Sequence, residues 1–180
     1  MDASTLSASP VDASQPQDPV VDRELLGIYL DDHHAGSVGG LELAKRAASN
    51  NPHGALGGFL AELIGDLQND QAALRQLMDE LGVRWKTPKA AVSWLSEKAA
   101  RLKPNGRVAG YSPLSRVVDL EGLIAGSRAR ASLFRTLASV LSADQRETYT
   151  LEQRAERAIV HVEALDHFRT AASAEAFLEG

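Results

Sequence analysis

The sequence contains no cysteine, and aromatic residues make up only 5% of its 180 positions. Disulfides and thiolate chemistry are therefore excluded, and any metal ion would have to be held by carboxylate or imidazole groups. No stretch approaches the roughly 18 uninterrupted apolar residues that a membrane-spanning helix needs, so we expect no membrane span. The net charge of −5 gives no general affinity for nucleic acid.

The motifs of several large enzyme classes are also missing. The sequence has no G-x-x-x-x-G-K-S/T loop for nucleotide phosphates and no G-x-S-x-G elbow for a hydrolase. The glycine-rich run GSVGG lies inside a helical pattern without a preceding strand, so it is not a dinucleotide-binding turn. The first 20 residues lack the basic and apolar parts of a signal peptide, which predicts a disordered tail on a cytoplasmic protein.

Alanine, leucine, arginine and glutamate are abundant, and 44% of the residues are hydrophobic. These four residue types are strong helix formers, and a chain of this length is long enough to bury one core. We therefore predict an all-α protein with a single domain over residues 21–175, built as a four-helix bundle.

Capping residues and breaks in the apolar pattern divide this domain into four long helices. Aspartate, or serine followed by proline, is typical of helix starts, and asparagine or glycine of helix ends. A capping box over residues 142–145 predicts that the fourth helix follows the third through a tight turn. The predicted helices are 22–50, with an alternative start at 18, and then 55–81, 112–141 and 142–170.

Between the second and third helices lies a crossover that is far longer than an antiparallel hairpin needs. Thr87-Pro88 predicts a short extra helix inside this crossover, which two tryptophans pin to the bundle. The segment 84–107 carries seven basic residues against the single acid Glu97. We favour a solvated basic face for this segment, and the alternative is a docking surface for an acidic protein partner.

Helical projection places several polar side chains toward the interior of the bundle. His33 falls in the apolar stripe of the first helix, with His34 at its edge. Glu121 and Arg128 fall in the stripe of the third helix, and Asp70 lies at the margin of the second. Because a lone buried charge is costly, each of these groups needs a partner. We therefore predict a buried polar network of Asp31, His33, Asp70, Glu121 and Arg128.

Four helices of this length, joined by two short links and one long crossover, resemble the ferritin-like superfamily. That resemblance implies a di-iron or di-manganese centre, built from a Glu on each of two helices and Glu-x-x-His on each of the other two. No Glu in this sequence has a His three positions later, so a metal would need an irregular ligand set. The candidate ligands are Asp31, His34, Glu62, Asp66, Glu121, Glu163 and His167.

The first two helices also look like the interfacial site of the starvation-type mini-ferritins, which combines first-helix histidines with second-helix carboxylates. The counterparts in this chain are His33, His34, Glu62 and Asp66. Where such a first helix would offer a second histidine about three turns further on, this chain has Lys45 and Arg46. That difference argues against ferroxidase activity.

Two functions from different classes remain open. We favour a binding or structural bundle protein, not an enzyme, in which a polar network replaces the di-metal site. The alternative is an oxidoreductase or iron-handling protein that binds iron or manganese through the irregular ligand set. Gly122 and Gly126 form a small-xxx-small pair, which predicts close approach of another helix and favours a homodimer.

Overall fold

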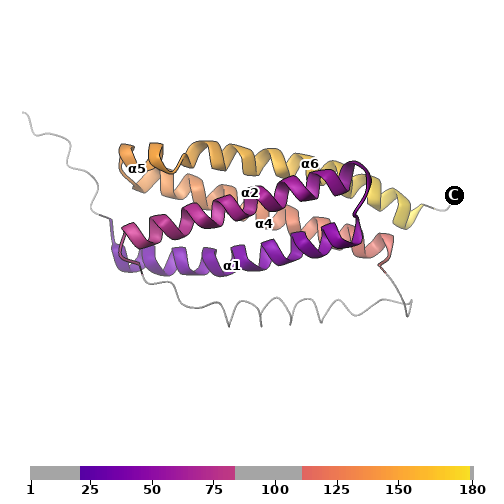
Figure 1. The fold of residues 1–180 in the computed structure, drawn as a ribbon, viewed down its shortest axis with the longest axis horizontal. Helices are drawn as coiled ribbons and strands as arrows, with labels where there is room; N and C mark the ends of the chain where they lie inside the picture. Colours follow the sequence, from indigo (N-terminus) through magenta and orange to yellow (C-terminus); the bar gives the residue numbers. More distant parts are fainter. Residues whose placement is uncertain (1–20, 84–110, 179–180) are drawn as a thin grey trace, which may run out of the picture.

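The computed structural model describes residues 21–83 and 111–178, and the protein is all-helical over these ranges. Four long helices lie side by side along one axis, and a short fifth helix lies at one end of the bundle (Figure 1). The helices are α1 (Arg23–Asn50), α2 (Gly54–Glu80), α4 (Pro113–Val140), α5 (Ala143–Thr148) and α6 (Leu151–Phe177). None of the helices in these ranges has the length and apolar character that crossing a membrane requires. The predicted N-terminal tail and the predicted crossover with its extra helix lie outside the described residues.

Side-chain caps determine where α1 and α4 begin, as the sequence predicts. The carboxylate of Asp22 accepts hydrogen bonds from two backbone N–H groups of α1, at 3.0 and 3.1 Å. Ser112 accepts one from the N–H of Ser115 at 3.1 Å, and Pro113 occupies the first position of α4. These caps satisfy N–H donors that have no partner within the helix itself. With the start at Asp22, the predicted bounds of the first three helices agree with the observed ones to within one residue.

The predicted fourth helix is wrong at both ends. The capping box at Ser142 begins only α5, which stops after six residues. Thr150 then adopts a left-handed conformation, with φ 48° and ψ 46°, before α6 begins at Leu151. Such a conformation is unusual for a β-branched residue, and neither glycine nor proline marks this break in the sequence. At its other end, α6 continues to Phe177 instead of ending near residue 170.

α5 ties the end of α2 to the beginning of α6. Gln145 Nε2 and the Tyr149 hydroxyl each donate a hydrogen bond to the carboxylate of Glu80, at 2.7 Å in both cases. These two hydrogen bonds lower the pKa of Glu80. Burial of the phenol, followed by the effect of Glu80, raises the pKa of Tyr149 to about 12.

Contacts at the other end of the bundle establish the directions of the helices. Asn51, which follows α1, donates a hydrogen bond to the Tyr111 hydroxyl just before α4, at 3.2 Å. Arg116 near the start of α4 lies 2.7 Å from Glu175 near the end of α6. α4 therefore starts where α1 and α6 end, whereas α2 ends at the opposite end beside α5 (Figure 1). As a result, α2 and α4 run in the same direction, antiparallel to α1 and α6.

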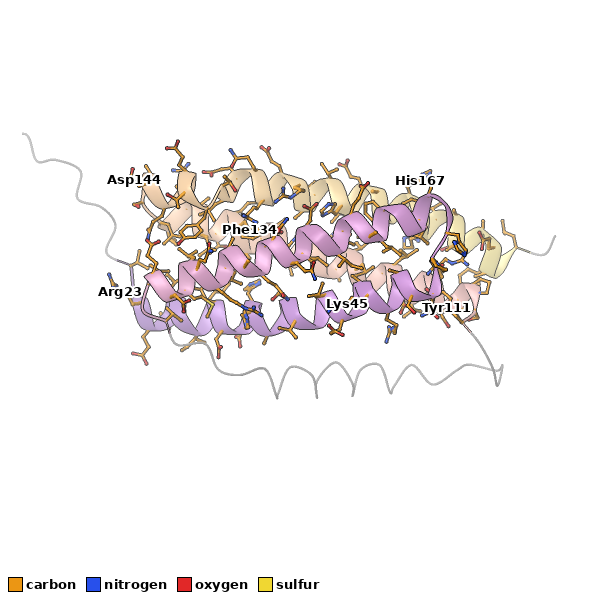
Figure 2. The ribbon with its side chains drawn as sticks, viewed as in Figure 1. Arg23, Lys45, Tyr111, Phe134, Asp144 and His167 are labelled. Atoms are coloured by element: carbon orange, nitrogen blue, oxygen red, sulfur yellow. The ribbon has the colours of Figure 1, made fainter. Side chains whose placement is uncertain are left out.

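The apolar core consists of two clusters, one toward each end of the bundle. Phe134, visible between the helices in Figure 2, belongs to the cluster near α5. The cluster at the α5 end contains the buried residues Leu26, Leu30, Leu74, Leu77, Met78, Leu133, Phe134, Leu137, Leu151 and Ala155. The cluster at the other end contains Ala44, Ala47, Leu60, Leu63, Val117, Leu120, Leu123, Ile124, Val162, Leu165 and Ala172. On all four long helices, polar residues occupy the positions between the two clusters, and they form a central layer.

Two glycines allow close approach of backbone or side chains. An alanine Cβ at position 57 would lie 2.7 Å from the carbonyl oxygen of Asn51. Gly57 therefore allows the first turn of α2 to lie close to the backbone that links α1 to α2. A Cβ at position 122 would lie 2.8 Å from Cδ2 of Leu43, while Gly126 faces open space. The close approach predicted at Gly122 is therefore made with α1 of the same chain, and a second subunit is not needed to explain it.

Candidate functional site

The central layer contains six ionisable side chains that contact one another, and we call this set the arginine network. It connects α2, α4 and α6. Its members are Asp66 and Asp70 of α2, Arg130 of α4, and Arg154, Arg157 and His161 of α6. α4 and α6 pack against each other along much of their length, whereas α2 and α6 contact each other at only a few positions. Long polar side chains of the network thus bridge α2 and α6.

Asp70 is the centre of the network and is only 4% exposed. Its Oδ1 accepts hydrogen bonds from Arg154 Nη1 and, at 3.4 Å, from Arg157 Nη2. Its Oδ2 lies 3.4 Å from Nε of Arg130. The guanidinium carbon of Arg154 also lies 6.0 Å from the centre of the Phe134 ring, which is a cation–π distance. One buried carboxylate is therefore surrounded by three positive charges.

His161 connects Arg130 to the second carboxylate. Its Nδ1 lies 2.5 Å from Arg130 Nη2, and its Nε2 lies 3.1 Å from Oδ2 of Asp66. Because a guanidinium only donates hydrogen bonds, Nδ1 must accept, and Nε2 must carry the proton that is donated to Asp66. These two contacts select one tautomer of the neutral imidazole. Burial, followed by the charge of Arg130, lowers the pKa of His161.

Arg130 is the most deeply buried arginine of the network, with 9% of its side chain exposed. Burial lowers the pKa of its guanidinium, and Asp70 and then Asp66 oppose this effect. Its Nε is close enough to Asp70 for an ion pair but is not aligned for a hydrogen bond. Its Nη1 is buried and has no hydrogen-bond partner in the described part of the chain. Two donor nitrogens of this buried guanidinium, Nε and Nη1, are therefore unsatisfied within the described residues, as is Oδ2 of Asp70 beside them.

A second polar cluster lies in the same layer, between α1 and α2. His34 is only 1% exposed, and its Nε2 accepts a hydrogen bond from Nε of Arg75 at 3.2 Å. Gln71 Nε2 donates to the hydroxyl of Ser37 at 3.2 Å, and that hydroxyl donates to the backbone oxygen of His34. Burial, followed by the charge of Arg75, lowers the pKa of His34, and Asp31 opposes this effect. His34 is thus held as a neutral hydrogen-bond acceptor at Nε2.

The histidine of α1 that faces the interior is His34, and not His33 as predicted. His34 is buried, whereas His33 is half-buried and packs edge-on against Tyr29, with 4.5 Å between ring centroids. Neighbouring helix positions differ in direction by about 100°. Because the projection places His34 at the edge of the stripe, a rotation of the stripe by part of this angle makes His34 the inward residue. Asp31 is half-buried.

The predicted inward orientation of Glu121 and Arg128 is wrong, because both residues are exposed. α4 packs against both α1 and α6, so its buried surface is wider than a single apolar stripe. Ser127 and Arg130 occupy the inward polar positions of α4 instead. Of the residues predicted for the polar core, Asp70 alone belongs to the arginine network.

The structure does not bring the predicted metal ligands together. Glu62, Glu121, Glu163 and His167 are exposed, Asp31 and Asp66 are half-buried, and His34 is buried. Over residues 21–83 and 111–178, no group of three or more Asp, Glu and His side chains is arranged to hold a metal ion. Of these candidates, Asp66 alone contacts a histidine of the arginine network, and its other partner is Arg157, at 3.6 Å.

Four members of the network were not predicted as site residues: Arg130, Arg154, Arg157 and His161. Their spacing did contain a usable signal. Two carboxylates stand four residues apart on α2, while basic residues stand three and four residues apart on α6. Each set occupies one face of its helix, and the two faces carry opposite charge. Pairing charged faces between helices would therefore have found most of the site.

Each ionisable group of the network is engaged with another member of it. Both ring nitrogens of His161 are engaged, and each carboxylate is bound by at least one arginine. With three arginines, two aspartates and a neutral histidine, the network has a formal charge of +1. Comparison with protein-family models, with curated proteins and with solved structures finds no match to this chain.

Proposed function

We propose that the protein is a ferritin-like four-helix bundle with a binding or structural role, in which the arginine network takes the place of a di-metal centre. The directions of the helices support the bundle type. α2 and α4 run in the same direction, and a connection that crosses the length of the bundle produces this arrangement in ferritin-like proteins. The network also lies between the two apolar clusters, at the level where such bundles hold their cofactor.

The environment of Asp70 is the observation that carries this proposal. In a di-metal bundle, central carboxylates donate their oxygens to metal cations. Here the corresponding positive charge comes from three guanidinium groups around one carboxylate. A divalent cation placed among these groups would be repelled by each of them, and the low dielectric of the interior strengthens that repulsion.

One contact favours a second candidate, an iron- or manganese-binding oxidoreductase or iron-handling protein. Asp66 accepts from Nε2 of His161 at 3.1 Å, and 26% of its side chain is exposed. A carboxylate beside a histidine is a frequent element of metal sites. For these two groups to bind one metal, Nε2 would have to release its proton and Arg157 would have to move away from Asp66.

Elemental analysis distinguishes the two candidates. The protein is purified without chelators or a histidine tag, incubated with ferrous iron or manganese under anaerobic conditions, and desalted. Asp66→Asn removes the carboxylate that contacts His161. Glu62→Gln is the matched control, because Glu62 is an exposed carboxylate one turn earlier on the same helix.

We expect much less than one metal atom per chain in the wild type and in both variants, and no oxygen consumption on addition of ferrous iron. About one iron or manganese atom per chain, lost in Asp66→Asn and kept in Glu62→Gln, would establish the second candidate instead. Metal that is present in all three proteins at the same level would place a site elsewhere and would also contradict the proposal.

A further inference from the structure

The charges of the arginine network do not balance. Three guanidinium groups face two carboxylates, and His161 is held neutral by its contacts on both ring nitrogens. Among the described residues, Asp70 and Asp66 are the acids whose charges act on Arg130, and the charge of Arg157 opposes them. Asp70 and Arg130 are deeply buried, and uncompensated charge beside them is costly.

The guanidinium of Arg130 also has unsatisfied hydrogen-bond donors. Within the described residues, Nη1 and Nε of Arg130 and the neighbouring Oδ2 of Asp70 are buried without a hydrogen-bond partner, and the Arg130 side chain is more than nine-tenths buried. Unsatisfied buried donors of this kind commonly mark the position of a water molecule or an ion. A water molecule would satisfy these groups but would leave the surplus charge, whereas an anion would accept from the guanidinium and would also offset that charge.

We infer that the arginine network binds a small monovalent anion of the size and charge of chloride, at Nη1 of Arg130. The anion brings the formal charge of the arginine network to zero. Arg157 is the partly exposed member of the network, with 39% of its side chain accessible, so it connects this position with solvent. The inference rests on the proposed absence of a metal from this layer, since a bound cation would occupy the same carboxylates.

Thermal unfolding provides the first test. The melting temperature is measured in sodium chloride and in sodium gluconate at equal ionic strength, since gluconate is too large for a buried site between helices. At a chloride concentration about ten times the dissociation constant, we expect a melting temperature about 4 °C higher in chloride than in gluconate. Equal melting temperatures in the two salts would overturn the inference.

Variants connect this effect to the network. Arg157→Gln removes the surplus charge, so its melting temperature should not depend on which of the two salts is present. Arg157→Lys keeps the charge and should keep the dependence. Arg146→Gln is the control, because Arg146 is a similarly exposed arginine that is paired with Glu152 at 2.6 Å outside the network. A chloride effect that persists in Arg157→Gln would show general salt stabilisation and would also overturn the inference.

Crystals of the wild-type protein soaked in sodium bromide give the direct observation. An anomalous peak within hydrogen-bond distance of Arg130 Nη1 would confirm the site. If bromide binds only at surface arginines, the outcome is an adventitious ion only. If the electron density at Nη1 shows a peak without anomalous signal, the peak is a water molecule. Either result would reject the anion site and leave the proposed function standing, whereas metal in the elemental analysis would reject the proposed function itself.

Discussion

Replacing Asp70 by asparagine tests whether the arginine network holds the bundle together. The Asp70 side chain is 5% exposed, and the side chains of Arg130 and Arg154 beside it are 9% and 16% exposed. Asn keeps the shape of the side chain but removes the only carboxylate that contacts these two arginines within residues 21–83 and 111–178. Removing one partner of a buried ion pair typically costs about 3–5 kcal/mol, because the other charge stays buried without compensation. We therefore expect the free energy of unfolding to fall by about 4 kcal/mol and the melting temperature by about 10 °C.

The assay is reversible urea unfolding followed by circular dichroism, with Asp166→Asn as the control. Asp166 also pairs with an arginine, Arg169, at 2.8 Å, but 56% of its side chain is exposed. Loss of such a surface pair should cost no more than about 1 kcal/mol. Adding Arg130→Met to Asp70→Asn removes the uncompensated guanidinium and should restore at least about 1 kcal/mol. If Asp70→Asn costs no more than the control, the network does not stabilise the fold and the reasoning fails.

Three further predictions follow from the described contacts. The pKa of His161 is lowered in the folded state, so the unfolded chain binds more protons as the pH falls below about 6.5, and stability should decrease there. Denaturation curves between pH 7.5 and 5.5 should therefore show a smaller decrease for His161→Gln. Gly57→Ala should lower the melting temperature because its Cβ would lie 2.7 Å from a backbone oxygen. Its neighbour Gly58 faces open space, so Gly58→Ala should instead gain up to about 1 kcal/mol in the same assay. Tyr149 should ionise near pH 12 in an absorbance titration, and Tyr149→Phe should reduce the absorbance change at that pH.

Helix bounds were predictable from the sequence wherever a side chain determines them. Asp22 and the Ser112-Pro113 pair cap α1 and α4 by contacts within a few residues, so local sequence is sufficient. The break before α6 is different. Thr150 is left-handed although a threonine has no intrinsic preference for that conformation. Hydrogen bonds from Gln145 and Tyr149 to Glu80, 65 and 69 residues away in sequence, hold α5 against α2. Such distant contacts cannot be found by local pattern analysis.

Inward-facing residues were less predictable than helix bounds. A helix that packs on one side buries a single stripe, and the apolar pattern then gives its direction. α4 instead buries residues against two neighbours, and this widened surface includes Arg130 while Arg128 remains exposed. On α1, the direction of the stripe decided between His33 and His34. In both cases a residue of the same type lies one or two positions away, so that residue type does not distinguish the inward position from the outward one.

The arginine network also determines how α2 and α6 align. The two helices contact each other at few positions. Two of the buried residues near the centre of α6, Ala155 and Ala158, are small. Small apolar residues discriminate weakly between neighbouring alignments, because one alanine packs much like another. A slip of α6 by one helical turn, about 5.4 Å, would remove the imidazole of His161 from between Asp66 and Arg130, and the buried guanidinium would lose the acceptor at Nδ1. Leaving a buried charged group without a hydrogen-bond partner costs more than the difference between two alanine packings. The contacts of His161 therefore favour one alignment of α6 on α2.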